Sequence, residues 1–275
     1  MDYFNDDIEK VKKIVSGEKY YVEDLAALYK NTNEDLIKIY KDIDFRDKKV
    51  LSVQASSDQL FSSLILGAKE VDTFDANRLT EYYYYLRKWC LEETKEYYLS
   101  ANNKLLERIL EKHYDENKYA AKLWLELIKV AKPSLYYSSL FFREPLYWSV
   151  PYKGREEELI EILKEKEHNF NCINIFEKTD LNKKYDIIIL SNIIEYLLDL
   201  EDKELEKVFT NNMLNLIEED GIIISSKILN PRYEECELDN YFDHKEGIEG
   251  RILYGGEYAP LSYQYTKKKL TISSN

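Results

Sequence analysis

The sequence predicts an α/β protein built on a doubly wound, mostly parallel sheet. Two observations carry this prediction. From residue 49 onward, short apolar segments rich in β-branched residues alternate with segments of helical periodicity. The segment 185–191 contains the continuous apolar run Ile-Ile-Ile-Leu, which is typical of a strand buried on both faces of a parallel sheet.

The first 45 residues are predicted to be helical and to form an N-terminal cap. Apolar residues at helical spacing indicate helices at 7–15, 21–30 and 33–40. Asn31 or Thr32 is expected to cap the third helix, because both side chains can accept hydrogen bonds from backbone N–H groups. Residues 46–275 are assigned to one Rossmann-like domain.

The nucleotide-binding part begins with a strand at 49–54, a helix at 58–66 ended by Gly67, and a strand at 70–75. A helical insertion of about 79–168 is expected next, with helical segments at 78–102, 104–131 and 156–166 and an aromatic-rich irregular stretch at 133–151. Further strands are predicted at 171–176, 185–191 and 221–227, with a helix at 202–217. The segments 251–254 and 263–270 are expected to form a terminal antiparallel pair.

The composition disfavours several classes of protein. Lys and Arg number 39 and Asp and Glu 52, so the formal net charge is −13, and an acidic surface repels nucleic acid. The three cysteines lie far apart without a zinc-binding spacing, so no metal is expected. The acidic N-terminus is unlike a signal peptide, and no apolar run reaches the ~20 residues of a membrane span. A cytoplasmic location is therefore expected.

The residues that follow the first two predicted strands indicate a nucleoside-binding site. In a doubly wound sheet, ligands bind where strands end and helices begin, and free N–H groups at a helix start accept anions. Asp75 follows the first strand by about 20 residues, the spacing of the acid that accepts ribose hydroxyls. The other interpretation is that Asp75 only caps the backbone N–H groups of Asn77 or Arg78.

These residues resemble the first motif of class I S-adenosylmethionine (SAM)-dependent methyltransferases. More narrowly, 50–58 and 66–77 are similar to a bacterial group with the pattern V-L-S-V-x-A-S-G-D and L-G-A-K-x-V-x-x-x-D-x-N, related to the 3-amino-3-carboxypropyl transferases of betaine-lipid synthesis. The Rossmann-like resemblance covers about 48–77 and 170–227. It implies SAM as cofactor and the following binding residues: Gln54, Ala55, Ser56, Ser57, Asp58, Asp75, Ala76 and Asn77.

The chain departs from this pattern at two positions, because the family places glycine where Gln54 and Ser57 stand. Glycine allows positive φ and a close approach of the ligand to the backbone. Gln54 therefore either crowds the methionine half of SAM or supplies amide contacts to its carboxylate.

The resemblance implies roles for two further loops. Glu177, or its rival Asp180, is expected to meet the adenine amino group, unless both are solvated loop acids. The loop that begins at Ser191 is expected to face the methyl group and the acceptor. There Asn192 could hold the acceptor, Glu195 could act as general base, and Tyr196 could orient the nucleophile. Alternatively, Glu195 and Tyr196 only begin and pack a helix.

The expected function is that of a SAM-dependent methyltransferase with a small-molecule or lipid-like acceptor. Transfer of the 3-amino-3-carboxypropyl group from SAM is the alternative within the same fold. The missing glycines motivate a third hypothesis, a non-catalytic SAM-binding or interaction protein. An NAD-dependent oxidoreductase is disfavoured, because no G-x-G-x-x-G motif follows the first strand.

Overall fold

The structure is a computed structural model of the chain. It describes the backbone of residues 3–16, 28–32, 34–96, 102–131, 134–135, 149–199, 202–226, 237–246, 249–251, 258–260 and 262–268.

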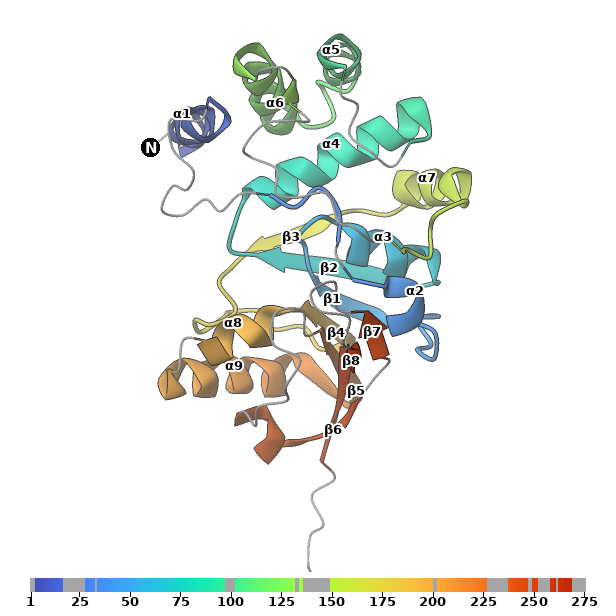
Figure 1. Ribbon diagram of the computed structural model, residues 1–275, viewed down its shortest axis with the longest axis vertical. Helices are drawn as coiled ribbons and strands as arrows, with labels where there is room; N and C mark the ends of the chain where they lie inside the picture. Colours follow the sequence, from blue (N-terminus) through green and yellow to red (C-terminus); the bar gives the residue numbers. More distant parts are fainter. Residues whose placement is uncertain are drawn as a thin grey trace, which may run out of the picture.

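A seven-stranded sheet organises the described part of the chain (Figure 1). Its strands are β1 (Lys49–Val53), β2 (Glu70–Asp75), β3 (Asn169–Cys172), β4 (Tyr185–Ser191), β5 (Ile217–Ser226), β6 (Phe242–Glu246) and β9 (Ser262–Lys267). They follow the order β3-β2-β1-β4-β5-β9-β6, in which β1 to β5 are mutually parallel and β9 is antiparallel to both neighbours. The prediction of a mostly parallel sheet is confirmed.

Helices cover both faces of this sheet, as a doubly wound fold requires. Val50 and Ile187 share one apolar core with α3 (Asp58–Ile65) and α7 (Glu156–Glu165). The next residue of each strand, Leu51 and Ile188, belongs to a second core with α8 (Ile193–Asp199) and α9 (Lys203–Leu216). Because successive side chains of a strand point to opposite faces, this alternation explains why β4 is apolar without interruption.

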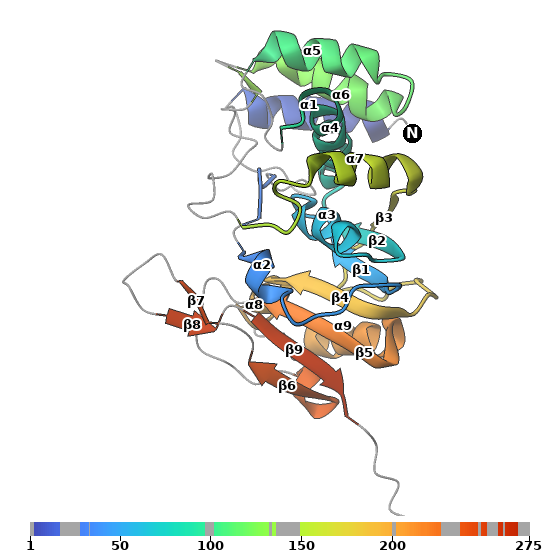
Figure 2. The same ribbon diagram turned by 90° about the vertical axis from the view of Figure 1, so that its right-hand side faces the viewer.

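A separate group of helices lies beyond α3 and α7. It consists of α1 (Tyr3–Val15), α4 (Leu79–Thr94), α5 (Asn103–Lys112) and α6 (Lys118–Val130). Figures 1 and 2 both show α1, α5 and α6 on the side of α4 that faces away from the sheet. Ile8 and Val11 of α1 share a core with Trp89 and Trp124, so α1 packs with the helical insertion. The short α2 (Leu36–Ile39) packs in the core of α3 instead.

The N-terminal and insertion helices differ from the prediction in their bounds. The third predicted helix is shortened to α2, and its cap is Asp35, whose carboxylate accepts the N–H of Lys38, in place of Asn31 or Thr32. The segment 78–102 ends early as α4, because Lys95 adopts φ 56°. The segment 104–131 divides into α5 and α6. Residues 21–27 of the second predicted helix and 136–148 of the aromatic stretch lie outside the described residues.

Two strand predictions are corrected. β3 begins two residues before the predicted 171–176 and ends at Cys172, because Ile173 and Ile175 leave the sheet to pack in the core that contains α9. The predicted pair of 251–254 with 263–270 is wrong: β9 pairs with β5 and β6, while β7 (Glu249–Arg251) pairs with β8 (Tyr258–Pro260). β6 (sequence FDHKE) was missed, because its polar composition is typical of an edge strand. A 3₁₀ turn, Glu237–Asn240, precedes it.

Within the described residues, none of the helices combines the length and the apolar character that crossing a lipid bilayer demands.

Candidate functional site

β1 and β4 lie side by side at the centre of the sheet. β2 and β3, which follow β1 in the chain, lie on one side of this pair, and β5, which follows β4, lies on the other, so the order of the strands reverses between β1 and β4. Loops that leave two such strands run to opposite faces, and the crevice between them is where open α/β sheets bind ligands. Here those loops are 54–57, which leads into α3, and 191–192, which leads into α8.

Three residues of these two loops adopt left-handed backbone conformations without being glycine. They are Ala55 (φ 37°), Ser57 (φ 70°) and Ser191 (φ 52°). Such conformations strain a residue that has a Cβ and tend to gather at functional sites. Ser57 therefore adopts, with strain, the left-handed conformation for which the family pattern has glycine at this position. The second left-handed residue of the loop is Ala55 and not Gln54.

The Gln54 side chain is fully buried and held by protein groups at both ends. Its Nε2 donates to Ser57 Oγ at 2.7 Å, and its Oε1 lies 3.1 Å from His168 Nε2. The amide therefore fastens the loop to the segment before β3. The two expected roles of Gln54 toward the methionine half of SAM stay predictions, and His168 is a partner that sequence reasoning missed.

Asp58 is the innermost residue of the site, with 0% of its surface exposed. Its Oδ1 accepts hydrogen bonds from Arg87 at 3.0 Å and from the Tyr152 hydroxyl. Its Oδ2 accepts the N–H of Thr32 at 2.5 Å and the hydroxyl of Ser56 at 2.6 Å. Two hydrogen bonds fill each carboxylate oxygen. The Asp58 side chain is thus an internal anchor of the site, and its predicted contact with the cofactor stays a prediction.

Arg87 and Tyr152 complete this anchor from distant parts of the sequence. Arg87 belongs to α4, its Nη1 also donates to the carbonyl oxygen of Ser56, and its Nη2 donates to Tyr152 Oη at 3.1 Å. The guanidinium also lies 5.3 Å from the centre of the Phe61 ring. Burial, followed by the charge of Asp58, raises the pKa of Tyr152 well above its usual value.

Asp75 ends β2 beside the 54–57 loop. Its Oδ2 accepts the N–H of Ala55 at 3.0 Å, and its Oδ1 accepts the N–H of Asn77 at 2.9 Å. Burial raises the pKa of Asp75 to about 6, against the opposing effect of these N–H donors. The cap on Asn77 that was the alternative interpretation therefore exists. The Thr80 hydroxyl and the Ala76 N–H also act on this carboxylate, so ribose hydroxyls would join or replace these donors.

The two residues after Asp75 lead into α4. Ala76 is exposed, and the side-chain oxygen of Asn77 accepts the N–H of Leu79 at 3.1 Å at the start of that helix. This hydrogen bond fixes the position of the Asn77 side chain at the start of α4.

A second buried carboxylate at the site, Glu34, was missed by sequence reasoning. It is 2% exposed, and its Oε2 accepts the hydroxyl of Thr32 at 2.9 Å, the amide of Gln59 at 2.5 Å and the hydroxyl of Ser191 at 3.0 Å. Ser191, a predicted cofactor residue, thus contacts the N-terminal segment. No local pattern signals Glu34, because its partners come from α3 and from the end of β4.

The remaining predicted residues occupy the expected loops. Glu177 and Asp180 are both exposed, and Glu177 accepts a hydrogen bond from Asn174 at 3.0 Å. Asn192 is half-buried, and its carbonyl oxygen accepts the N–H of Glu195 at 3.1 Å, at the start of α8. Glu195 is buried, whereas the side chain of Tyr196 lies outside the described residues. Their assigned roles stay predictions.

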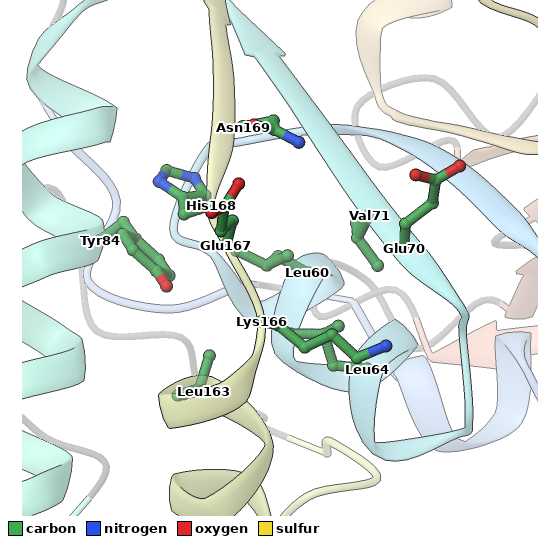
Figure 3. A pocket seen from close by; sticks show the side chains of 10 residues that line it. All are labelled: Leu60, Leu64, Glu70, Val71, Tyr84, Leu163, Lys166, Glu167, His168 and Asn169. Atoms are coloured by element: carbon green, nitrogen blue, oxygen red, sulfur yellow. The ribbon is translucent and has the colours of Figure 1, made fainter.

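A cavity of about 190 Å³ lies elsewhere, at the opposite end of β2 from Asp75 (Figure 3). It is smaller than the ~300–1,000 Å³ typical of sites for drug-sized ligands. Figure 3 shows Tyr84 and His168 on one side and Glu70 and Val71 on the other. The complete lining is Leu60, Leu64, Glu70, Val71, Tyr84, Leu163, Lys166, Glu167, His168 and Asn169.

His168 connects this cavity to the 54–57 loop. Its ring stacks on Tyr84 with the two centroids 3.7 Å apart. Burial, with a smaller effect of Lys88, lowers its pKa to about 3, so the imidazole is neutral. Because Gln54 Oε1 can only accept, the ring proton belongs on Nε2.

A further charged cluster lies between α4 and α5. The nearest side-chain ligand atoms of Glu92, His113 and Glu116 all lie within 4.8 Å of one another. Lys88 enters the same cluster, 3.2 Å from Glu116 and 3.6 Å from Glu92. An ammonium group among the carboxylates makes this an ion-pair network that joins the two helices.

No known family model matches the chain, and no curated protein matches it. Among solved structures, the ribosomal protein L11 methylase of Lactobacillus delbrueckii subsp. bulgaricus is 14% identical, covering 85% of this chain and 76% of that one at a TM-score of 0.42. The TehB-like SAM-dependent methyltransferase of Corynebacterium glutamicum is 8% identical, with 97% and 98% covered and a TM-score of 0.41. The N-methyltransferase NodS of Bradyrhizobium japonicum, in complex with S-adenosyl-L-homocysteine (SAH), is 8% identical, with 96% and 87% covered and a TM-score of 0.39. Values this low carry no argument about the cofactor or acceptor of this chain.

Proposed function

We propose that this protein is a SAM-dependent methyltransferase that acts on a small-molecule or lipid-like acceptor. The observation that carries the proposal is Asp75, a carboxylate at the end of β2 beside a left-handed loop, next to the central reversal of the sheet. A nucleoside cofactor needs this combination: an acid for the ribose, and a helix start with free N–H groups for an anion.

The residues of the site fit the parts of SAM. Asp75 would accept the ribose hydroxyls, and the N–H groups of Ser56 and Asp58 at the start of α3 would face the methionine carboxylate, while that of Ser57 donates to the carbonyl oxygen of Gln54 at 2.6 Å. Glu177 or Asp180 would meet the adenine amino group from the loop after β3. Ala76 and Asn77 would line the nucleoside, and Ser191 would border the methyl group. When bound, SAM supplies a methyl group on a positively charged sulfur.

The protein's part in methyl transfer is mainly alignment, since a nucleophile held in line with the methyl carbon needs little acid–base assistance. Asn192 and Glu195 stand after β4, where the acceptor would lie. We assign Asn192 to acceptor binding, Glu195 to removal of a proton from the acceptor and Tyr196 to its orientation. The net charge of −13 favours an acceptor other than nucleic acid.

Aminocarboxypropyl transfer is the second candidate, because the resemblance of 50–58 and 66–77 extends to enzymes of that kind. The two reactions differ in which carbon bonded to sulfur is attacked. Methyl transfer releases SAH, whereas aminocarboxypropyl transfer releases methylthioadenosine. Chromatography of the nucleoside product distinguishes them. Binding of SAM without either product, in the presence of acceptors, would favour a non-catalytic SAM-binding protein.

Calorimetric titration with SAH tests the proposal. Asp75→Asn should weaken binding at least tenfold, because hydrogen bonds to a charged group contribute roughly 1.5–3 kcal/mol. Asp44→Asn, which removes an exposed carboxylate paired with Arg46, should bind SAH like the wild type. Failure of the wild type to bind millimolar SAH would contradict the proposal.

A further inference from the structure

Glu34 is a buried carboxylate without a cationic partner among the described residues. Its three hydrogen-bond donors, Thr32, Gln59 and Ser191, are all neutral. Burial of a charge is unfavourable unless an opposite charge or strong hydrogen bonds offset it. A ligand that carries a positive charge could supply the missing partner.

Two further acceptor atoms of Glu34 and Gln59 have no donor among the described residues. All three donors meet Oε2 of Glu34, and no described residue donates to its Oε1. The amide of Gln59 donates through Nε2, and its Oε1 is buried with no hydrogen-bond partner in the described part of the chain. Glu34 and Gln59, joined by the hydrogen bond from Gln59 Nε2 to Glu34 Oε2, therefore each present one oxygen that lacks a donor among the described residues. An ammonium group, with three N–H donors and a positive charge, matches such a pair.

The position of the cluster relates it to the reacting end of the cofactor. Gln59 lies in the first turn of α3, and Ser191 is the last residue of β4. These two elements border the crevice between β1 and β4 in which the proposed function places the methionine half and the methyl group. The left-handed conformation of Ser191, with φ 52°, accompanies the hydrogen bond from its hydroxyl to Glu34.

We propose that Glu34 and Gln59 form a subsite for a protonated amine at the point of methyl transfer, so that the acceptor is an amine. This inference rests on the proposed function. The ammonium nitrogen of the acceptor transfers a proton to the Glu34 carboxylate, which takes the place of Glu195 as proton acceptor when the acceptor is an amine, and regains its lone pair. That pair forms the N–C bond to the methyl carbon as the C–S bond breaks, and the C–S electrons remain on sulfur. The products are the N-methylated amine and SAH.

Three nucleoside probes test this subsite by calorimetry. SAH carries the α-ammonium of the methionine half but no charge at sulfur. Methylthioadenosine lacks the amino-acid half altogether. Sinefungin carries a protonated amine on carbon where SAM carries the methyl-bearing sulfur. The wild type should therefore bind sinefungin more tightly than SAH.

Glu34→Gln should weaken sinefungin at least tenfold and change SAH less than threefold. Glu206→Gln is the matched control: Glu206 is equally buried, but it pairs with Lys203 on α9, and its replacement should leave all three affinities unchanged. Gln59→Met, which keeps the side-chain length and removes the unpartnered oxygen, should cause the same selective loss for sinefungin. If Glu34→Gln fails to fold, the sinefungin and SAH affinities of Gln59→Met test the subsite in its place.

Each other outcome overturns the inference in a recognisable way. A tenfold loss for SAH with methylthioadenosine unchanged would assign the carboxylate to the α-ammonium of the cofactor instead. Equal affinities in wild type and both variants would remove Glu34 and Gln59 from the site. A wild type that binds none of the three probes would refute the proposed function, and the amine subsite with it.

Discussion

Asp58 and Glu34 are two carboxylates in the same small region, and both are almost completely buried. Asp58 pairs with Arg87 and accepts further hydrogen bonds from a hydroxyl and a backbone N–H. Within the described part of the chain, Glu34 accepts hydrogen bonds from neutral donors alone, and all of them meet one oxygen. The two side chains even share Thr32, whose N–H donates to Asp58 and whose hydroxyl donates to Glu34.

The difference shows how a buried acid that holds a fold is distinguished from one that awaits a ligand. The hydrogen bonds of Asp58 are complete, so nothing is gained there from a ligand. Those of Glu34 are incomplete, so a cation would add stability on binding. Four experiments test this distinction between the two carboxylates and the backbone that surrounds them.

Arg87→Met should lower the free energy of unfolding by about 3–5 kcal/mol, because it leaves the Asp58 carboxylate buried without its cation. Urea unfolding measures this value. The double variant Asp58→Asn with Arg87→Met should recover part of the loss, since no charge is then left unpaired. A loss of less than about 1 kcal/mol for Arg87→Met would show that the buried Asp58 carboxylate, like that of Glu34, does not need a cation to keep the protein folded.

Asp75 should show opposite pH effects on stability and on binding. Its folded pKa of about 6 lies above the ordinary value of 3.8, so the folded state takes up a proton before the unfolded state does as the pH falls. Relative to Asp75→Asn, the wild type should therefore gain about 1.4 kcal/mol of stability between pH 7.5 and pH 5, of which about 1 kcal/mol comes between pH 6 and pH 5. The gain is complete below the unfolded pKa and lost as the pH rises through 6. SAH affinity should weaken over the same range in the wild type only.

Urea unfolding and SAH titration of both proteins at pH 7.5, 6 and 5 provide the measurement. A parallel pH dependence of the wild type and Asp75→Asn would exclude Asp75 as the titrating group.

Glu34→Gln should leave the protein as stable as the wild type or raise its free energy of unfolding by about 1 kcal/mol, because it removes an uncompensated buried charge. Thermal and urea unfolding without ligand measure the change. Asp58→Asn is the matched variant and should destabilise the protein. A loss of about 3 kcal/mol in Glu34→Gln would mean that Glu34 holds the fold, as Asp58 does.

Ser57→Gly should be more stable than Ser57→Ala by about 1 kcal/mol, since both lose the hydroxyl that bonds Gln54 but only glycine relieves the left-handed backbone. Thermal unfolding of the two variants isolates the strain. Equal stabilities would show that the loop relaxes around residue 57 without strain.

The central part of the fold is predictable from local sequence. β2 and β4 have the predicted bounds, and β1 and α3 differ by one residue at one end. Their apolar residues and the Gly67 turn are local signals. The C-terminal strands are less predictable, because the pairing of β9 with β5 and β6 joins segments about 20 to 45 residues apart and β6 is polar.

The candidate site is predictable only in outline. The position of Asp75 follows from its spacing after β1, and the need for a left-handed conformation at Ser57 follows from the family pattern. The partners that decide what each acid can do come from far away: Arg87 for Asp58, and Ser191 for Glu34. No spacing rule connects them, so the sequence analysis could anticipate neither the ion pair of Asp58 nor the presence of Glu34 at the site.

The place of β9 in the sheet has a consequence for the order of folding. β9 lies between β5 and β6, although it follows both in the chain. During synthesis, β5 therefore has an open edge, and β6 has no strand to join, until residues 262–267 leave the ribosome. An open edge beside an apolar strand such as β5 invites pairing with other chains. A chain truncated before residue 262 should consequently aggregate rather than fold to a smaller sheet.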